Sequence, residues 1–313
     1  MRKLPANSNF PRASDVVYRV FMHWQRIALI GVGLLGGSLG LAIKQRKLSN
    51  RVVGFVRRPA SVKECEALGV VDQVVTDLAA AVTDAELVIL CTPLGQMREI
   101  AERIQPALKK GTLVTDVGSV KAPIVQELEP IIAKGAGEFI GSHPMAGAEK
   151  TGPSAARADL FMGAVCAITP SANSQPEAVR SIEEFWRSVG AVPLRIGPEV
   201  HDELVSRSSH LPHVVAAELS NYVLSPVHPK EQSMLCATGF RDTTRIASGS
   251  PEMWRDISIS NRRNLARVLG VFIEDLQEFQ LALENDDRKA IEEFFSDAKQ
   301  RRDQWCGQST SPE

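Results

Sequence analysis

Short apolar runs alternate with amphipathic segments from residue 26 to about residue 197. The runs are rich in Val, Ile and Leu, which is typical of strands that are buried on both faces of a parallel sheet. Because helix-like segments separate these strands, the pattern predicts βαβ units and an α/β fold with a doubly wound, mostly parallel sheet. The expected strands are 26–31, 51–56, 86–91, 112–117 and 138–142, with two more at 164–169 and 192–197 that extend the sheet.

The pattern changes after Gly197, because residues 198–306 contain no convincing strand. Within 261–285 the apolar residues recur at alternating steps of four and three, which is the period of a helix that buries one stripe. This stripe predicts either packing inside a helical domain or, since the spacing is like that of a coiled coil, a helix shared between two subunits. The residues of the stripe are Leu265, Leu269, Phe272, Leu276, Phe279 and Leu283.

These patterns divide the chain into four parts. We expect residues 1–25 to form a flexible leader, in which Met22 is an alternative start, and 26–197 to form the α/β domain. Residues 198–306 form an all-helical domain, and 307–313 a polar tail. The leader lacks the continuous apolar core of a secretory signal.

Composition narrows the class of protein. A length of 313 residues fits two domains at a prior of ~150 residues each. The net charge of -1, with acids and bases interspersed, gives no reason to expect nucleic acid or a membrane surface as a partner. No apolar run is long enough to span a bilayer. The five cysteines are dispersed without a CxxC pair, which favours a reducing cytoplasm over a disulfide framework.

A glycine-rich turn follows the first expected strand. Gly31, Gly33 and Gly36 spell GxGxxG around Leu34 and Leu35, and a helix-like segment comes next. In this context the glycines permit a tight turn and a close approach to a pyrophosphate, while the helix N-terminus offers N–H groups to the anion. The motif therefore predicts a Rossmann-type, dinucleotide-binding domain; the alternative is a glycine-rich turn without a ligand.

Small or polar residues end the next strands. Thr92 and Pro93 end one strand, and the segment from Asp116 to Ser119 ends the following one. Ligands of doubly wound sheets gather beyond the carboxyl ends of the strands, so we expect Thr92, Pro93 and Asp116 to contact the cofactor.

His143 follows the expected strand at 138–142 and precedes Pro144. At the same carboxyl edge, a histidine with a pKa near neutrality can accept a proton from a hydroxyl while hydride leaves the same region. A hydrogen-bonded structural histidine is the alternative, but the expected location favours a catalytic one.

Several segments together resemble a known family. In chain order they are IGVGLLGGSLGLAI, CTP, TDVGSVK, GSHPMAGAEKTG, SRSSHLPHVVAAEL and TGFRDTTRIASGSPEMWRDI. They resemble the prephenate/arogenate dehydrogenases of tyrosine biosynthesis over residues 26 to about 285. The resemblance implies a nucleotide-binding domain, an all-helical domain that forms a homodimer, and oxidative decarboxylation of a cyclohexadienol to a 4-hydroxyphenyl product. It implies neither a mutase extension nor a regulatory domain, and it does not decide between prephenate and arogenate.

The resemblance also implies roles for single residues. His143 would be the catalytic group that is bonded to the ring hydroxyl, and Ser119 would help to hold both. Arg245 would pair with a carboxylate of the substrate, since a guanidinium binds a carboxylate through two parallel hydrogen bonds. Three further residues would line the substrate pocket or guard its mouth: His213, Glu149 and Asp242.

Two of these residues, Arg245 and His213, have an alternative interpretation. Arg245 stands three residues after Asp242, and this spacing also suits a surface ion pair. His210 and His213 share one helix face, yet no third ligand cluster is visible nearby, so we expect no metal site.

The second expected strand bears on the choice of cofactor. It reads RVVGFVRRP, with Val56 where many relatives carry Asp, followed by Arg57 and Arg58. An acidic residue there would bind the ribose 2′-OH of NAD, whereas arginines accommodate a 2′-phosphate. The segment therefore favours NADP over NAD, unless both arginines are solvated turn residues.

Two other functions remain open. A related hydroxy-acid dehydrogenase would carry a catalytic lysine in the helical domain, but Lys230 is the only lysine between residues 151 and 288 and its neighbourhood resembles a loop. A non-catalytic dinucleotide sensor would have no reason to keep four residues together: Ser119, His143, His213 and Arg245.

Overall fold

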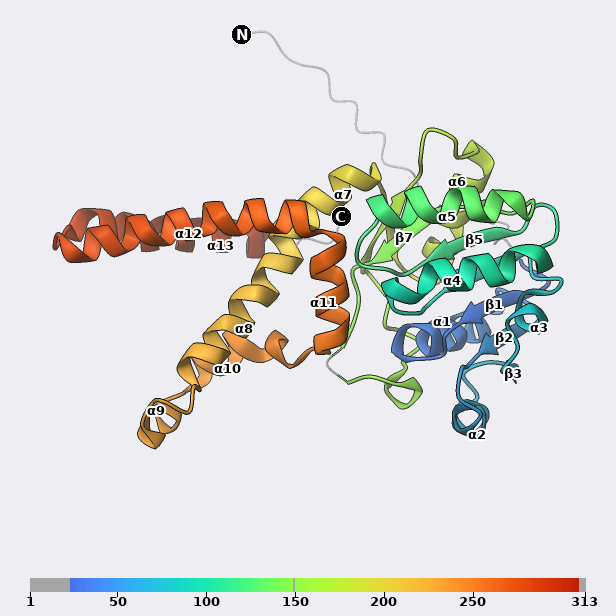
Figure 1. The fold of residues 1–313 in the computed structure, drawn as a ribbon, viewed down its shortest axis with the longest axis horizontal. Helices are drawn as coiled ribbons and strands as arrows, with labels where there is room; N and C mark the ends of the chain where they lie inside the picture. Colours follow the sequence, from blue (N-terminus) through green and yellow to red (C-terminus); the bar gives the residue numbers. More distant parts are fainter. Residues whose placement is uncertain (1–22, 149, 310–313) are drawn as a thin grey trace, which may run out of the picture. The chain divides into compact units, whose positions relative to one another are not determined.

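The computed structural model describes residues 23–148 and 150–309. The chain forms two compact units that divide between Pro198 and Glu199, and each is described by itself (Figure 1). The first unit is an α/β unit and the second a helical unit. None of the described helices is long and apolar enough to cross a membrane.

A six-stranded sheet, in which every pair is parallel, forms the centre of the α/β unit. From β1 the chain first adds β2 and β3 on one side of the sheet, and then β4, β5 and β6 on the other side. This reversal of strand order between β1 and β4 is the arrangement of doubly wound dinucleotide-binding sheets. The predicted fold class is confirmed, although the short strand β3 was not predicted. In pairing order the strands are β3 (Gln73–Val75), β2 (Val52–Phe55), β1 (Ile27–Ile30), β4 (Leu87–Leu90), β5 (Leu113–Asp116) and β6 (Glu138–Phe139).

The last predicted strands do not extend this sheet. They form a separate three-stranded sheet, in which β8 pairs antiparallel with β7 and parallel with β9. The chain changes sheets after the Ile140 N–H, which still donates to Val114 O (2.9 Å), because the next strand finds its partner in β8. The strands are β7 (Gly141–Pro144), β8 (Val165–Thr169) and β9 (Val192–Arg195).

Alternation along the central strands sends side chains into two cores. Ile27 and Leu29 of β1 belong to one cluster, whereas Ala28 and Ile30 belong to the other. Each buried Leu or Ile contributes about 1.5–3 kcal/mol relative to exposure. The first cluster includes residues of α1 (Leu34–Gln45), α2 (Ala60–Leu68) and α6 (Pro176–Ser188), and the second residues of α3 (Leu78–Val82), α4 (Leu94–Ile104) and α5 (Ala122–Lys134).

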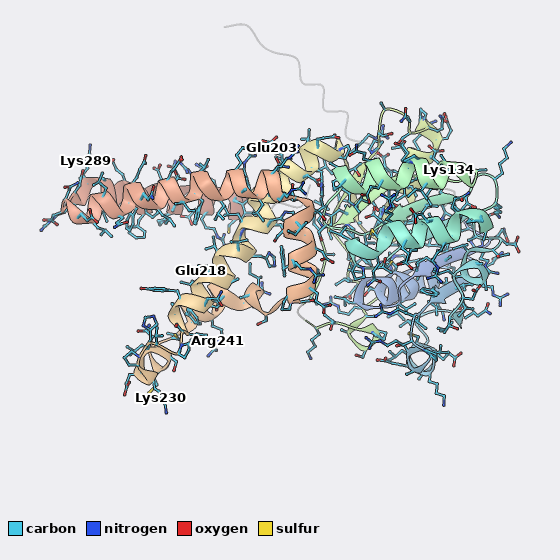
Figure 2. The ribbon with its side chains drawn as sticks, viewed as in Figure 1. Lys134, Glu203, Glu218, Lys230, Arg241 and Lys289 are labelled. Atoms are coloured by element: carbon cyan, nitrogen blue, oxygen red, sulfur yellow. The ribbon has the colours of Figure 1, made fainter. Side chains whose placement is uncertain are left out.

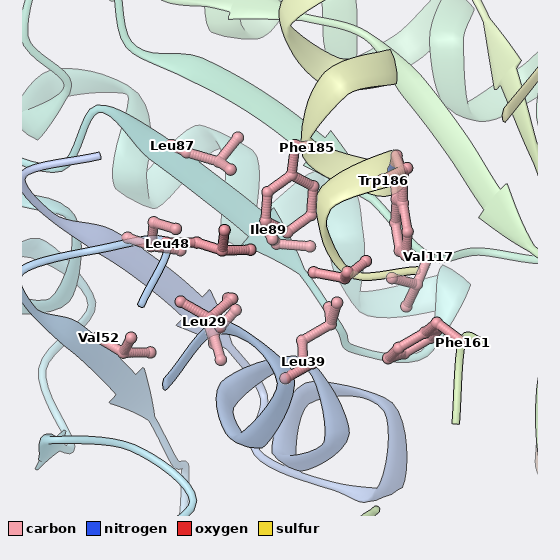
Figure 3. Packing of buried hydrophobic residues seen from close by; sticks show 14 of the residues in the cluster. Leu29, Leu39, Leu48, Val52, Leu87, Ile89, Val117, Phe161, Phe185 and Trp186 are labelled. Carbon is pink, nitrogen blue, oxygen red and sulfur yellow. The ribbon is translucent and has the colours of Figure 1, made fainter. Parts of the chain in front are cut away.

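Helix α6 joins the small sheet to the first cluster. Figure 3 shows Phe185 and Trp186 pointing from α6 toward the side chains of Ile89 and Val117. Trp186 also makes edge-to-face contacts with Phe185 and Phe161, both with ring centroids 5.5 Å apart. These three aromatic rings pack beside the strand that carries His143, because Trp186 Nε1 donates to Ser142 Oγ of that strand.

Both ends of the described chain differ from the predicted boundaries. Trp24, placed in the leader, is buried, and it forms a β-bridge with Ser49 because its N–H donates to Leu48 O (2.9 Å). The rest of the predicted leader, residues 1–22, lies outside the described residues. At the other end, α13 (Arg288–Ser309) includes the first three residues of the predicted polar tail.

The helical unit contains no strand among its described residues, as predicted. A π-helical segment, η3, joins α7 to α8, and such segments recur at functional sites. The elements are α7 (Pro198–Val205), η3 (Ser206–His210), α8 (Leu211–Val223), α9 (Lys230–Met234), α10 (Thr238–Thr244), η4 (Arg245–Ser248), α11 (Pro251–Ser260), α12 (Arg262–Glu284) and α13.

The predicted apolar stripe lies on α12, which runs alongside α13 as a helical hairpin (Figure 1). Leu265 near its start is buried, and Phe279 packs on Phe294 of α13 with ring centroids 4.5 Å apart. Leu276 and Leu283 in contrast are 47% and 54% exposed. The stripe is therefore used partly for packing inside the unit, and part of it stays uncovered.

Candidate active site

The glycine-rich turn leaves β1 with a geometry that only glycine allows. Gly31 has φ +102°, and a Cβ there would lie 2.9 Å from Cys91 O. A Cβ on Gly36 would lie 2.0 Å from Gly31 O, so α1 can approach the turn only without a side chain at that position. A Cβ on Gly33 would meet none of the described atoms within 4 Å, so this glycine faces open space.

The start of α1 is suited to an anion. Its N-cap residue Gly33 has no side-chain cap, and no acidic residue stands in the first turn, which is fully within the described chain. The first N–H groups of a helix have no intrahelical partner, and the helix dipole favours negative charge there. Leu34 and Leu35, both half-buried, open this turn as predicted.

Thr92 provides a second indication of a ligand. It follows β4, and its Cγ2 would lie 3.1 Å from a Cβ on Gly31, so it stands beside the glycine turn. Its Oγ1 is buried without a hydrogen-bond partner among the described residues. Buried hydroxyls are rarely left unpaired, and such a group beside an open glycine cradle fits a polar ligand. Pro93, the N-cap of α4, continues this edge.

The end of β2 presents two cations. The Val56 N–H donates to Val75 O (3.0 Å), which keeps the buried Val56 in the sheet, whereas Arg57 and Arg58 are exposed. Helix α2 begins two residues later, and its described first turn carries no acidic residue. The end of β2 can therefore bind a negatively charged group of a ligand.

Asp116, which the sequence predicts to contact the cofactor, has internal partners for both oxygens of its side chain. Its side chain is fully buried. The Gly118 N–H donates to its Oδ2 (2.8 Å), where Lys121 Nζ also donates, and the Ser142 N–H donates to its Oδ1 (3.0 Å). The internal lysine and these amides take both oxygens, which a sequence pattern could not indicate.

His143 lies on β7, opposite Ala167 of β8, with only 7% of its surface exposed. The strand ends one residue later at Pro144, so His143 lies inside a strand, whereas the predicted strand ended at residue 142. Ser119, half-buried, occupies the turn between β5 and α5, two residues before Lys121. Through Ser142, which is bonded to Asp116, the strand of His143 is attached to the turn of Ser119.

His213 is the most constrained candidate of the helical unit. On α8, its Nδ1–H donates to Ser209 O of η3 (2.9 Å), which leaves Nε2 as the acceptor. Its ring stacks on Trp254 of α11 with centroids 3.8 Å apart and planes at 29°. Burial lowers the pKa of His213 below the usual 6.5; the Ser209 carbonyl opposes this shift and the charge of Arg245 adds to it. The imidazole is therefore neutral at pH 7.

Asp242 and Arg245 lie close together in the sequence but belong to different segments. Asp242 is exposed on α10, and Arg245, also exposed, begins η4. The charge of Arg245 reaches His213, which places both in one region of the helical unit. Glu149 lies outside the described residues.

Three residues with a role in this architecture were not predicted: Lys121, Ser142 and Trp254. All three stand inside the motifs that carried the resemblance, in TDVGSVK, GSHP and SPEMWRDI. Ser142 and Trp254 have partners that are distant in sequence, and Lys121 bonds both to Asp116, five residues away, and to Ser142, so proximity to a predicted site residue was the available signal. His210 makes an edge contact with Trp254 (6.1 Å), and the described residues contain no group of three His, Cys, Asp or Glu side chains suited to a metal.

Comparison with known proteins places this geometry in a family. Residues 39–194 match the nucleotide-binding domain of prephenate dehydrogenase, and residues 197–297 match its dimerization domain. The chain is 34% identical over 286 residues to the cyclohexadienyl dehydrogenase of Zymomonas mobilis, covering 90% of this chain and 96% of the relative. It is 33% identical over 283 residues to the prephenate dehydrogenase of Bacillus subtilis, covering 88% and 75%.

A solved structure agrees. The prephenate dehydrogenase of A. aeolicus, in complex with hydroxyphenyl propionate and NAD+, has a TM-score of 0.84 and 30% identity, covering 90% of this chain and 98% of that one. Since both domain families occur in the expected order and a relative is matched over nearly its full length, the chain belongs to the prephenate dehydrogenase family of nicotinamide-dependent oxidoreductases.

Proposed function

We propose that this chain catalyses the nicotinamide-dependent oxidative decarboxylation of prephenate or arogenate to a 4-hydroxyphenyl product. The observation that carries the proposal is the position of His143, a buried imidazole on a strand attached to the carboxyl end of β5. The same unit carries the glycine cradle and the unpaired Thr92 hydroxyl, which fit a dinucleotide.

His143 acts on the hydroxyl of the substrate ring. As hydride leaves the ring carbon that bears this hydroxyl, the imidazole accepts the hydroxyl proton, and it returns the proton to the oxygen once the ring is aromatic. The bond between the ring and its carboxylate breaks, CO2 leaves, and the electron pair of that bond enters the ring. The nicotinamide, when bound, supplies the hydride acceptor. Ser119 holds the imidazole and the hydroxyl in position.

The helical unit recognises the carboxylates of the substrate. Arg245 pairs with one carboxylate, because a guanidinium offers two parallel donors to it. His213 offers Nε2 to the substrate in one fixed orientation, since Ser209 and Trp254 hold its ring. Asp242 and Glu149 guard the mouth of the pocket. Residues 26–197 thus form the cofactor domain and residues 198–306 the substrate and dimerisation domain.

The cofactor preference is for NADP over NAD. Arg57 and Arg58 are exposed at the end of β2, where the ribose 2′ position of a bound dinucleotide is recognised, and Val56 offers no carboxylate to the 2′-OH. The A. aeolicus relative was crystallised with NAD+, so the proposed preference would differ from the cofactor of that crystal.

The active form is a homodimer through the helical unit. Tyr222, Val227 and Leu235 are 67–83% exposed, in addition to the uncovered part of the α12 stripe. Exposed apolar surface on this scale marks an interaction site, and this unit matches a dimerization domain. The five cysteines are all free, which fits a cytoplasmic enzyme.

The test is a nicotinamide absorbance assay with prephenate and arogenate, each combined with NAD+ and with NADP+. We expect reduced nicotinamide, one CO2 per turnover and a 4-hydroxyphenyl product with at least one substrate. A protein that binds the dinucleotide but oxidises neither substrate would contradict the proposal and favour a non-catalytic sensor. Oxidation of a hydroxy acid instead would identify a different dehydrogenase.

A further inference from the structure

The α/β unit contains a fully buried ion pair that no part of the proposed chemistry uses. Lys121 and Asp116 both have side chains without solvent exposure, and Lys121 is among the largest fully buried side chains. Removing an ammonium from water is costly unless it is paired and hydrogen-bonded. A hydrophobic pair of similar size is often as stable as a buried ion pair, so stability alone does not explain this one.

Lys121 and Asp116 form hydrogen bonds to residues of β5, of the turn that follows it, and of β7. Lys121 Nζ donates to Asp116 Oδ2 and to Ser142 O (2.9 Å). The Ser142 N–H donates to Asp116 Oδ1 (3.0 Å). The backbone of Ser142 is thus held on both sides by the pair. Since β7 pairs with β8 and belongs to the other sheet, these bonds replace the missing strand ladder between β5 and β7.

The hydroxyl of Ser142 completes the connection. It donates to Asp116 O (2.5 Å) and accepts from Trp186 Nε1 (3.1 Å). It also lies 2.8 Å from Thr115 Oγ1. Because the serine proton already points to Asp116 O, Thr115 is the donor of this third bond. One donor and two acceptor positions are the full capacity of a hydroxyl. The side chain therefore has one orientation, and with it the strand at residue 142.

These hydrogen bonds fix the backbone next to both proposed catalytic groups, His143 and Ser119. His143 is the next residue after Ser142, and alternation along a strand sends its side chain to the opposite face. Ser119 stands inside the turn that Asp116 and Lys121 close, where the Gly118 N–H also donates to Asp116 (2.8 Å). A small rotation of either backbone would change the position of the group that it carries.

We propose that Asp116, Lys121 and Ser142 are positioning residues that set His143 against Ser119. The inference rests on the proposed function, because it assigns these residues to the same reaction. Charged hydrogen bonds suit this task, since they fix direction as well as distance. A misplacement of about 1 Å can cost about 10²-fold in rate.

The test compares Lys121→Met with the double variant Lys121→Met/Asp116→Asn. The single variant leaves a buried carboxylate without its cation, so Tm falls strongly. The double variant removes both charges and recovers most of Tm. We expect kcat of the double variant to stay about 10–100-fold below wild type, while substrate KM and cofactor Kd change by less than about threefold. The acidic limb of its pH–kcat profile keeps its position, since His143 remains the base.

The control is Lys44→Met/Asp72→Asn, which removes a half-exposed ion pair of 3.1 Å from the same unit. We expect wild-type kcat. A Lys121/Asp116 double variant with recovered Tm and near wild-type kcat would show a merely structural pair and overturn the proposal. If it does not fold, Ser142→Ala decides: a fall in kcat of about tenfold at unchanged cofactor Kd supports positioning, and unchanged kcat overturns it. If the wild-type protein turns over neither prephenate nor arogenate, the proposed function is overturned as well.

Discussion

The surroundings of His143 and those of Arg245 are built in opposite ways. His143 is buried on β7. The residue before it, Ser142, makes hydrogen bonds through its N–H, its carbonyl and its hydroxyl. Arg245 is exposed at the start of a short 3-10 segment, in a unit that leaves many large apolar side chains uncovered. The chain alone therefore fixes the backbone that carries His143, the proposed proton acceptor, whereas Arg245, the proposed ligand of a substrate carboxylate, lies on the surface of its unit.

The difference follows from what each group must do. Proton transfer requires a near-attack geometry that is set before the substrate arrives. Carboxylate binding tolerates a flexible arginine that becomes ordered by its ligand. Figure 2 labels three further polar residues of the helical unit, Glu218, Lys230 and Arg241 on α8, α9 and α10, all of which are exposed.

The largest expected effect is at His143. His143→Asn should lower kcat by about 10²–10⁴-fold, because the proton acceptor is lost, with little change in cofactor Kd. Steady-state kinetics and cofactor titration measure both. His23→Asn, at an exposed histidine bonded to Asn50, is the matched control. A His143→Asn variant that retains near wild-type kcat would show that the imidazole is structural.

The second effect tests recognition. Arg245→Gln should raise substrate KM by about 10–100-fold and lower kcat less, since a charge-assisted hydrogen bond contributes about 1.5–3 kcal/mol to ground and transition state alike. Arg241→Gln on α10 provides the control, and it should leave KM unchanged. An unchanged KM in Arg245→Gln would show that Arg245 does not bind a carboxylate of the substrate.

The third effect concerns the cofactor. Arg57→Ala should lower kcat/KM for NADP+ by about tenfold and leave that for NAD+ nearly unchanged, because only NADP+ carries the 2′-phosphate. Lys63→Ala removes another exposed cation from the same region, on α2, and serves as the control. A wild-type preference for NAD+ would contradict this interpretation of the β2 edge.

The fourth effect is on assembly. Leu276→Glu should weaken the dimer, raising its dissociation constant by about 10–100-fold, because a charge would be buried in the apolar interface. Light scattering across a dilution series measures it. Leu68→Glu introduces the same charge on a leucine of similar exposure (42% against 47%) in the α/β unit, and should leave the dimer intact. A wild-type mass near 34 kDa at micromolar concentration would rule the dimer out.

The smallest effect is a pH dependence. Because burial lowers the pKa of His213, the unfolded chain binds this proton more tightly than the folded chain. The free energy of unfolding should therefore decrease as the pH falls below about 6.5. In His213→Asn that decrease should be smaller, as measured by urea unfolding at pH 7.5 and 5.5. Parallel pH curves for the two proteins would show that His213 titrates alike in both states.

The sequence by itself determined the features that depend on neighbours along the chain. The strands β1, β2, β4 and β5 could be predicted because each is a short apolar run, and the helical half because its apolar residues recur with a helical period. The glycine turn could be predicted because it requires a positive φ at Gly31 and the absence of a side chain at Gly36. The family motifs led to His143, Ser119 and Arg245.

Only the tertiary structure decided how distant residues meet. The strand-end pattern predicts a cofactor contact at Asp116, whereas in the structure its carboxylate accepts from the amide of Ser142, 26 residues away. Strands β7, β8 and β9 read as extensions of the main sheet, but the antiparallel pairing of β7 with β8 separates them. Trp254 showed no partner in the sequence, although it stacks on His213. Hydrogen bonds and ring contacts of this kind depend on the path of the whole chain, which no local period encodes.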